Sequence, residues 1–169
     1  IDTSTSEPES TMRLGASCAL RGVTLVDAPL TRSAPEAEAG KLNTMVGATP
    51  EVFASIEPIF KAYCENIFHV GGPGAGQIAK ACNQIVVAIN YAAVSEALVL
   101  AQRAGVDPAK VAQVLGGGLA ASRVLEMRGT TMIERTFEPG FRVDLHRKDL
   151  GIALSTGRST GSPLPVTAL

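Results

Sequence analysis

The sequence predicts an α/β region followed by an all-helical region, in which the α/β part is an incomplete doubly wound sheet. Three observations lead to this fold class. Strand and helix signals alternate up to about Gly72, glycines cluster at residues 71–74, and the chain from Ala75 to about Ala104 contains no strong helix breaker. A region with only three strand signals is too short for a full sheet of this type.

The α/β region contains two helix signals and three strand signals. Apolar residues at helical spacing over residues 9–20 predict a helix that ends at an Arg-Gly pair. Thr49 suits an N-cap, Pro50 a first turn and Glu51 the positive end of the helix dipole, so a second helix is expected from there to about residue 63. Short β-branched and apolar runs predict strands over residues 23–30, 42–46 and 66–70.

The all-helical region begins with a long helix that is expected over residues 75–104. This helix is apolar on nearly all sides, so it should be enclosed by other helices. A glycine ends it, and Asp107-Pro108 begins the next helix. A break follows at residues 116–118, and a last helix is expected over residues 141–156, directly after Pro139-Gly140.

Composition excludes several classes of function. The formal net charge is −1 and the basic residues are scattered, which gives no electrostatic case for binding nucleic acid or an anionic membrane. The most apolar stretch, residues 81–95, contains asparagine and glutamine and is too short and too polar to span a bilayer. Three cysteines without metal-ligand spacing and two isolated histidines predict no metal site, and the odd cysteine count favours a reducing, cytoplasmic compartment.

The strongest chemical constellation lies at the start of the long helix. A glycine turn, Gly74-Ala75-Gly76, is followed by Lys80, with Asn83 and Gln84 three and four residues later. That spacing places the ammonium and two amides on one helical face. A lysine on a largely apolar helix is partly removed from solvent, which lowers its pKa and suits it to proton transfer. The residues alone leave a second interpretation open, in which Lys80 extends from a core helix to the surface.

The glycine cluster does not fit a nucleotide-binding loop. A phosphate loop requires a lysine directly after its second glycine, and Gln77 stands there instead. The six-residue G-x-G-x-x-G fingerprint is absent as well, because Gly72, Gly74 and Gly76 alternate with single residues. The sequence therefore shows no dinucleotide fingerprint of its own.

Four motifs, in the expected order, resemble the β-hydroxyacid dehydrogenase family and together cover essentially the whole chain. Asp2-Thr3-Ser4-Thr5 is similar to the D-x-S-T turn of the family, and Asp27-Ala28-Pro29 is similar to the start of its substrate loop. The run from His69 to Asn83 contains the pattern G-x-G-Q-x-x-K-x-x-N, which resembles the catalytic signature of the family. The segment 141–150 resembles its closing helix and contains Lys148-Asp149-Leu150.

The resemblance implies a fold and a cofactor. Residues 1–72 would be the C-terminal part of a Rossmann-like NAD(P)-binding domain, joined by the long helix to an all-helical substrate and dimerisation domain over residues 73–169. The cofactor would be NAD or NADP, with the dinucleotide fingerprint expected before Ile1. This chain alone is therefore expected to bind the cofactor weakly or not at all, and to be inactive by itself.

The same resemblance implies roles for individual residues. Lys80 would be the catalytic residue that exchanges a proton with the substrate oxygen during hydride transfer. Thr5 and Lys148 would lie beside the nicotinamide of the cofactor, and no residue is expected to bind a metal. The substrate, a small anionic hydroxy or oxo acid, would be bound by Thr31, Arg32, Ser33, Asn83 and Gln84.

The expected substrate depends on particular segments of the chain. Asn83-Gln84, Gly117-Gly118-Leu119-Ala120 and the segment 137–150 are similar to the subgroup that reduces 2-hydroxy-3-oxopropionate (tartronate semialdehyde). Thr31-Arg32-Ser33 departs from the Ser-Gly-Gly of the family. The guanidinium of Arg32 either binds an extra anionic group or faces solvent or a partner subunit. A dehydrogenase of the 3-hydroxyisobutyrate or sulfolactaldehyde type is the alternative.

A hypothesis from another class is a non-catalytic helical oligomerisation module. An apolar helix is consistent with an interface in a homo-oligomer. Such a module would need neither Lys80 nor Asn83. An enzyme, in contrast, should have a substrate-sized pocket beside Lys80 that is bordered by Thr31 and Ser33.

Overall fold

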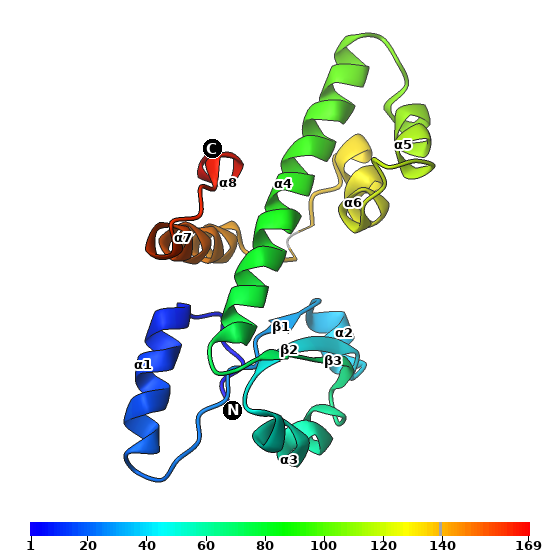
Figure 1. Cartoon of the computed structure of the whole chain (residues 1–169). Helices are drawn as coiled ribbons and strands as arrows, with labels where there is room; N and C mark the ends of the chain where they lie inside the picture. The colour runs from blue at the N-terminus through cyan, green and yellow to red at the C-terminus, as the bar shows by residue number, and fades with distance from the viewer. Residues whose placement is uncertain (139) are drawn as a thin grey trace. The chain divides into compact units, whose positions relative to one another are not determined.

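The computed structural model describes residues 1–138 and 140–169. These residues form two compact units, which we name the α/β unit (residues 1–84 and 141–168) and the helical unit (residues 85–140 and 169). Pro139, which belongs to the segment predicted before the last helix, lies outside the described residues. The predicted fold class is confirmed, since a small sheet is followed by a long helix and a helical region (Figure 1).

The helices and strands are divided between the two units. The helical unit contains the second part of α4 (Ala75–Arg103), α5 (Pro108–Gly116) and α6 (Arg123–Glu134). The domain boundary predicted after residue 72 stays a prediction, and the compact units are divided at other positions. The α/β unit contains α1 (Pro8–Ala19), β1 (Leu30–Thr31), α2 (Ala34–Glu38), β2 (Leu42–Gly47), α3 (Pro50–Phe60), β3 (Cys64–Gly71), the first part of α4, α7 (Val143–Thr160) and α8 (Pro165–Ala168).

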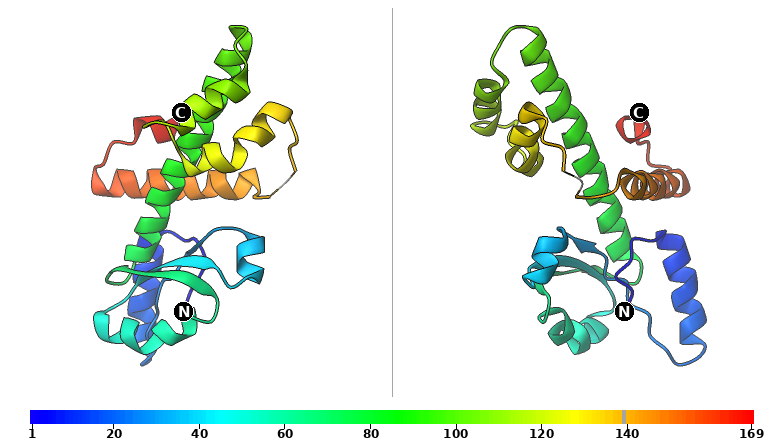
Figure 2. Two further views of the ribbon diagram at one scale, coloured as in Figure 1. Left: turned by 90° about the vertical axis from the view of Figure 1, so that its right-hand side faces the viewer. Right: turned by 180° about the vertical axis from the view of Figure 1, so that it is seen from behind.

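The sheet of the α/β unit has the strand order β1-β2-β3. β1 pairs antiparallel with β2, and β2 pairs parallel with β3, which it reaches through α3. Helix α3 lies against one face of this sheet (Figure 1, Figure 2), where Val46, Phe60 and Cys64 are part of one buried cluster. Thr49 caps α3 as predicted, because its hydroxyl accepts a hydrogen bond from the Val52 amide.

The strand predicted over residues 23–30 is wrong in its extent. Only Leu30–Thr31 forms a strand, while Asp27 makes isolated bridges to Asp2 and Gly47. Pro29 has no amide hydrogen to donate, so the ladder to β2 is interrupted between these points. Helix α2, which is unexpected from the sequence, follows directly after β1.

Helix α4 has the predicted bounds but not the predicted enclosure. Its Val94 and Leu98 pack in a buried cluster with Leu125 of α6. Val86 and Leu100, in contrast, are 59% and 70% exposed. Within the part of the chain that the structure describes, α5 and α6 cover one side of the second part of α4. Apolar side chains on its other sides stay exposed.

Candidate active site

Lys80 lies near the start of α4 with its side chain almost completely buried. The residue is 7% exposed, and its ammonium donates a hydrogen bond to the Leu30 carbonyl oxygen over 2.8 Å. Leu30 begins β1 and directly follows the Asp27-Ala28-Pro29 segment. The amine therefore faces the loop that the sequence assigns to the substrate.

The surroundings of Lys80 lower the pKa of its ammonium below the usual lysine value. Burial is the main cause, because it disfavours the charged form. The carboxylate of Asp149 opposes this effect and raises the pKa, whereas the positive charge of Lys148 lowers it. A lysine with a lowered pKa is suited to donate and accept a proton near neutral pH, which is the property that general acid–base catalysis needs.

A chain of polar contacts connects the residues around Lys80. The Asn83 amide donates to Gln84 Oε1 over 3.0 Å, and Gln84 Nε2 donates to Asp149 Oδ2 over 2.6 Å. Asp149 Oδ1 lies 2.9 Å from Lys148 Nζ, an ion pair without hydrogen-bond geometry. Gln84 and Asp149 are buried, and Asn83 is half-buried. Helix α7 thus contributes a buried carboxylate to the lysine site, which the spacing of residues along α4 did not indicate.

Thr5 and Lys148, the two residues predicted to lie beside the cofactor, contact each other. Lys148 Nζ donates a hydrogen bond to the Thr5 carbonyl oxygen over 2.7 Å. The Lys148 side chain keeps 46% of its surface exposed, and its ammonium also forms the ion pair with Asp149. A partly exposed ammonium beside a fixed backbone segment is suited to contact a polar ring with an amide group. The place of these two residues beside the nicotinamide of NAD or NADP stays a prediction.

The three residues predicted to bind substrate after Leu30 follow one another from the end of β1 to the N-cap of α2. Arg32 has a φ of 78°, a left-handed conformation that favours the glycine found there in the resembling family. Its guanidinium donates to the Lys41 carbonyl oxygen over 2.6 Å and forms an ion pair with Glu65. Ser33 donates its hydroxyl to Glu36 over 2.6 Å, and Thr31 is half-buried. The polar side chains of Arg32 and Ser33 are thus already paired within the protein, and a ligand would have to replace these contacts.

Asp27 is a site residue that the sequence indicated only as part of a motif. Its carboxylate is 1% exposed and accepts hydrogen bonds from the amides of Gly74 (2.7 Å) and Gln77 (3.0 Å) at the start of α4. The carboxylate fits because a Cβ atom on Gly47 would lie 2.4 Å from Oδ1, and one on Gly76 would lie 2.8 Å from Oδ2. An anion is stabilised at a helix N-terminus by the free amides and the dipole. Asp27 thus connects the segment that precedes β1 to the helix of Lys80.

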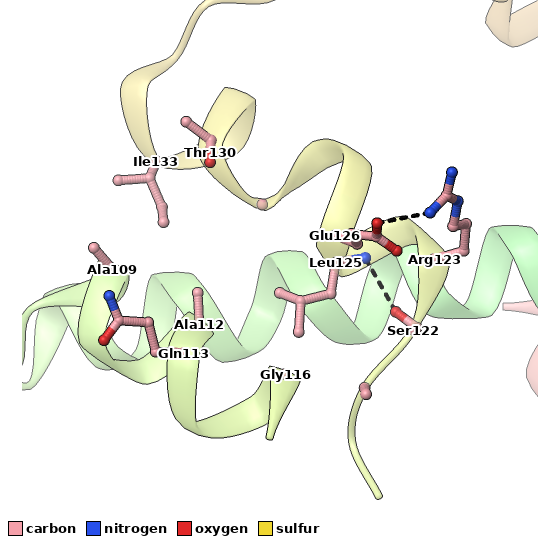
Figure 3. A pocket seen from close by; sticks show the side chains of 12 residues that line it. Ala109, Ala112, Gln113, Gly116, Ser122, Arg123, Leu125, Glu126, Thr130 and Ile133 are labelled. Carbon is pink, nitrogen blue, oxygen red and sulfur yellow. Dashed lines mark hydrogen bonds and ion pairs between the residues drawn. The ribbon is translucent and has the colours of Figure 1, made fainter. Parts of the chain in front are cut away.

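Neither of two pockets found among the described residues is lined by Lys80. One lies between α5 and α6 in the helical unit, has a volume of about 700 Å³ and is lined by residues that include Gly116 and Leu125 (Figure 3). The other is lined by residues of α7, α8 and the segment between them. The pocket predicted beside Lys80, with Thr31 and Ser33 at its border, is neither of these two and stays a prediction.

Comparison with known families agrees with this arrangement. Residues 1–71 match the family model described as the NAD binding domain of 6-phosphogluconate dehydrogenase. Residues 74–169 match the model described as NAD-binding of NADP-dependent 3-hydroxyisobutyrate dehydrogenase. The fold, the buried lysine and these two matches define the class of NAD(P)-dependent dehydrogenases.

Within this class, the chain belongs to the β-hydroxyacid dehydrogenase family, whose cofactor is NAD or NADP. It is 45% identical to 2-hydroxy-3-oxopropionate reductase of Escherichia coli (strain K12), over 99% of this chain and 58% of that protein. It is 37% identical to 2-(hydroxymethyl)glutarate dehydrogenase of Eubacterium barkeri, over 100% of this chain and 56% of that protein.

A solved structure supports the same assignment. Mycobacterium tuberculosis 3-hydroxyisobutyrate dehydrogenase with L-serine superimposes with a TM-score of 0.93 at 29% identity, over 99% of this chain and 60% of that one. The chain thus spans somewhat more than half the length of the relatives it matches.

Helix α4 has the length and hydropathy of a membrane span. The expectation that residues 81–95 are too short to cross a bilayer does not hold for the 29-residue helix that contains them. α4 is nevertheless the core helix of a soluble fold, because it lies in the segment shared with the dehydrogenases and carries Lys80 and Gln84 in polar contacts.

Proposed function

We propose that the full-length protein is an NAD(P)-dependent reductase of a small 3-oxo acid, and that this acid is 2-hydroxy-3-oxopropionate. The observation that carries the proposal is the buried ammonium of Lys80, which is held 2.8 Å from the carbonyl oxygen of Leu30, the first residue of β1. The 45% identity to the E. coli reductase supports the choice of substrate. The domain roles follow, with residues 1–72 as part of the cofactor domain and residues 73–169 as the substrate and dimerisation domain.

Lys80 exchanges a proton with the substrate oxygen in the proposed mechanism. When bound, the reduced nicotinamide supplies a hydride to the aldehyde carbon. Negative charge then develops on the carbonyl oxygen, and the Lys80 ammonium donates a proton to that oxygen, forming the alcohol and leaving a neutral amine. The Leu30 carbonyl orients the ammonium on the loop before the substrate arrives, so less orientation is needed during the reaction.

The substrate carboxylate is assigned to the loop after Leu30 and to Asn83. Thr31 and Ser33 offer hydroxyl groups, and Asn83 offers a half-buried amide. Gln84 is more deeply buried. Its side chain accepts a hydrogen bond from Asn83 and donates one to Asp149, so it holds the Asn83 amide in place for the substrate.

Arg32 offers a further positive charge to an anionic substrate. The side chains of Arg32 and Glu65 are 32% and 47% exposed. Exposed ion pairs contribute only about 0–1 kcal/mol to stability. A second anionic group on a substrate therefore replaces Glu65 at Arg32 with little loss of free energy.

A substrate panel tests the proposed function. The full-length protein is assayed with 2-hydroxy-3-oxopropionate, with the semialdehyde related to 3-hydroxyisobutyrate and with a sulfonated aldehyde, each with NADH and NADPH. We expect the highest kcat/KM with 2-hydroxy-3-oxopropionate. A clear preference for the sulfonated aldehyde that is lost in Arg32→Gly would instead assign Arg32 to a second anionic group, and no turnover of any member would reject the reductase.

The pH dependence of reduction is expected to shift in an Asp149→Asn variant. Reduction needs the protonated Lys80, so kcat/KM is lost as pH rises through the pKa of this group. The Asp149 carboxylate raises that pKa, and its removal lowers the pKa further. The alkaline limb of the pH profile should therefore move to lower pH. Asp144→Asn, which changes an exposed carboxylate on the same helix, is the matched control, and an unmoved limb in Asp149→Asn would contradict the assignment.

We further propose a cytoplasmic homo-oligomer. Val86, Ala93 and Leu100 are exposed and follow one another at seven-residue spacing on α4, so they form an apolar stripe along one side. Cys18, Cys64 and Cys82 are free thiols, which fits a reducing compartment. The stripe is also the observation that favours a purely structural oligomerisation module. Such a module would not explain the buried ammonium of Lys80.

A further inference from the structure

Gln77 is a fully buried amide on α4 with all its contacts directed at other segments of the α/β unit. Its side chain is 0% exposed. Oε1 accepts a hydrogen bond from the Ser6 amide over 3.0 Å, and Nε2 donates to the Ser4 carbonyl oxygen over 2.8 Å. Its backbone amide donates to Asp27 Oδ2 over 3.0 Å. A buried amide is tolerated only when its polar atoms are paired, and this one is paired at both ends.

The two side-chain bonds of Gln77 lie on either side of Thr5. The carbonyl oxygen of Thr5 itself accepts the Lys148 ammonium over 2.7 Å. Three bonds from two helices therefore fix three consecutive backbone positions, in a segment without regular secondary structure. All three bonds are made to backbone atoms of residues 4–6. They therefore fix the backbone at Thr5 and do not depend on the side chains of this segment.

We propose that Gln77 is a positioning residue that sets the place of Thr5 beside the nicotinamide, an inference that rests on the proposed function. Gln77 precedes Lys80 by three residues, so both lie on one face of α4. One turn of α4 thus carries Lys80, the proposed proton donor, and Gln77, whose hydrogen bonds hold the segment around Thr5. A displaced Thr5 changes the alignment of the hydride with the aldehyde carbon, while the carboxylate contacts at Thr31, Ser33 and Asn83 stay as they are.

The test uses Gln77→Met in the full-length protein, because methionine has a similar length and cannot form the two bonds. Misplacement of reacting groups by about 1 Å costs up to about a hundredfold in rate. We expect kcat/KM for NADH or NADPH to fall about tenfold to a hundredfold, with an unchanged KM for the oxo acid. The primary isotope effect with deuterated cofactor should rise, because hydride transfer becomes slower. Gln102→Met, at an exposed position of the same helix, is the control.

Gln77→Glu provides a second measurement that remains useful where Gln77→Met does not fold. An ionised glutamate keeps the acceptor for Ser6 but has no hydrogen for the Ser4 carbonyl oxygen, and its protonated form restores that donor. Burial without a second donor raises the pKa of such a carboxyl group. Activity relative to the wild type should therefore increase as pH falls. The absence of this rescue would overturn the inference.

The outcomes separate this inference from the proposed function. Wild-type turnover with unchanged kinetics in Gln77→Met overturns the role of Gln77 and leaves the reductase in place. A lower kcat with unchanged cofactor KM and isotope effect shows only a smaller folded fraction, and it also overturns the role. A wild-type protein without turnover on the substrate panel rejects the reductase, and the positioning role falls with it.

Discussion

Lys80→Ala should lower kcat for reduction about 10²- to 10⁴-fold in the full-length protein, the range that a general acid contributes. The reason is geometric, since the ammonium is buried and is oriented by its hydrogen bond to the Leu30 carbonyl oxygen. Lys80→Arg should lose a similar factor, because a guanidinium stays protonated near neutral pH and cannot act as the acid. Steady-state kinetics measures the loss of kcat, and calorimetric titration measures the affinity of each variant for the cofactor.

Cofactor binding should stay close to the wild-type affinity in Lys80→Ala, because Thr5 and Lys148 provide the proposed contacts on that side. Lys110→Ala, at an exposed lysine of α5, is the matched control and should leave turnover unchanged. Turnover of Lys80→Ala within a few-fold of the wild type would remove Lys80 from the mechanism. A large loss of cofactor affinity would instead assign it to binding.

Gly76→Ala should destabilise the protein by about 3 kcal/mol or more, at the upper end of the cost of overpacking. A Cβ atom at this position would lie 2.3 Å from the Met45 carbonyl oxygen and 2.8 Å from Asp27 Oδ2. The first of these is a backbone atom of β2, so the clash is not relieved by a change of rotamer. The start of α4 would have to move away from the sheet and from the carboxylate that holds it.

Urea or thermal unfolding of the chain measures this effect. Gly151→Ala is the matched control, because a Cβ atom there meets nothing within 4 Å and the residue lies inside α7. Alanine in the interior of a helix is favoured over glycine by about 0.5–1 kcal/mol, so this variant should be neutral or slightly more stable. Equal stability of the Gly76 and Gly151 variants would show that α4 does not need its close approach to β2.

The parts of the fold that were predicted depend on local signals. Thr49 and Asp107 each cap a helix that starts with a proline, and those helices begin where the sequence places them. Residues 23–30 carry β-branched side chains, yet only Leu30 and Thr31 pair as a strand. The pairing of this segment depends on Asp2 and on β2, which are distant in sequence, and local composition does not contain that information.

The same distinction applies to the candidate site. The proximity of Lys80, Asn83 and Gln84 follows from helical spacing alone. The contacts of Asp27 and Gln77 join residues that are 47 to 73 positions apart, and no local pattern predicts them. A signal was present nevertheless, because a polar residue among apolar ones must find a partner when it is buried. Asp27, directly after Leu25 and Val26, meets that description.

The carboxylate of Asp27 has a practical meaning for changing substrate preference. It joins the segment that precedes β1 to the first turn of α4, so the start of the segment proposed to bind substrate keeps a fixed distance from Lys80. In the proposed reductase, side chains from Thr31 onward can therefore be exchanged to accept longer or more highly charged aldehydes without a change in the position of Lys80. A substitution at Asp27 would displace both this segment and Lys80. The position is therefore unsuitable for library design, but it can be used to test how rigidly the segment is held.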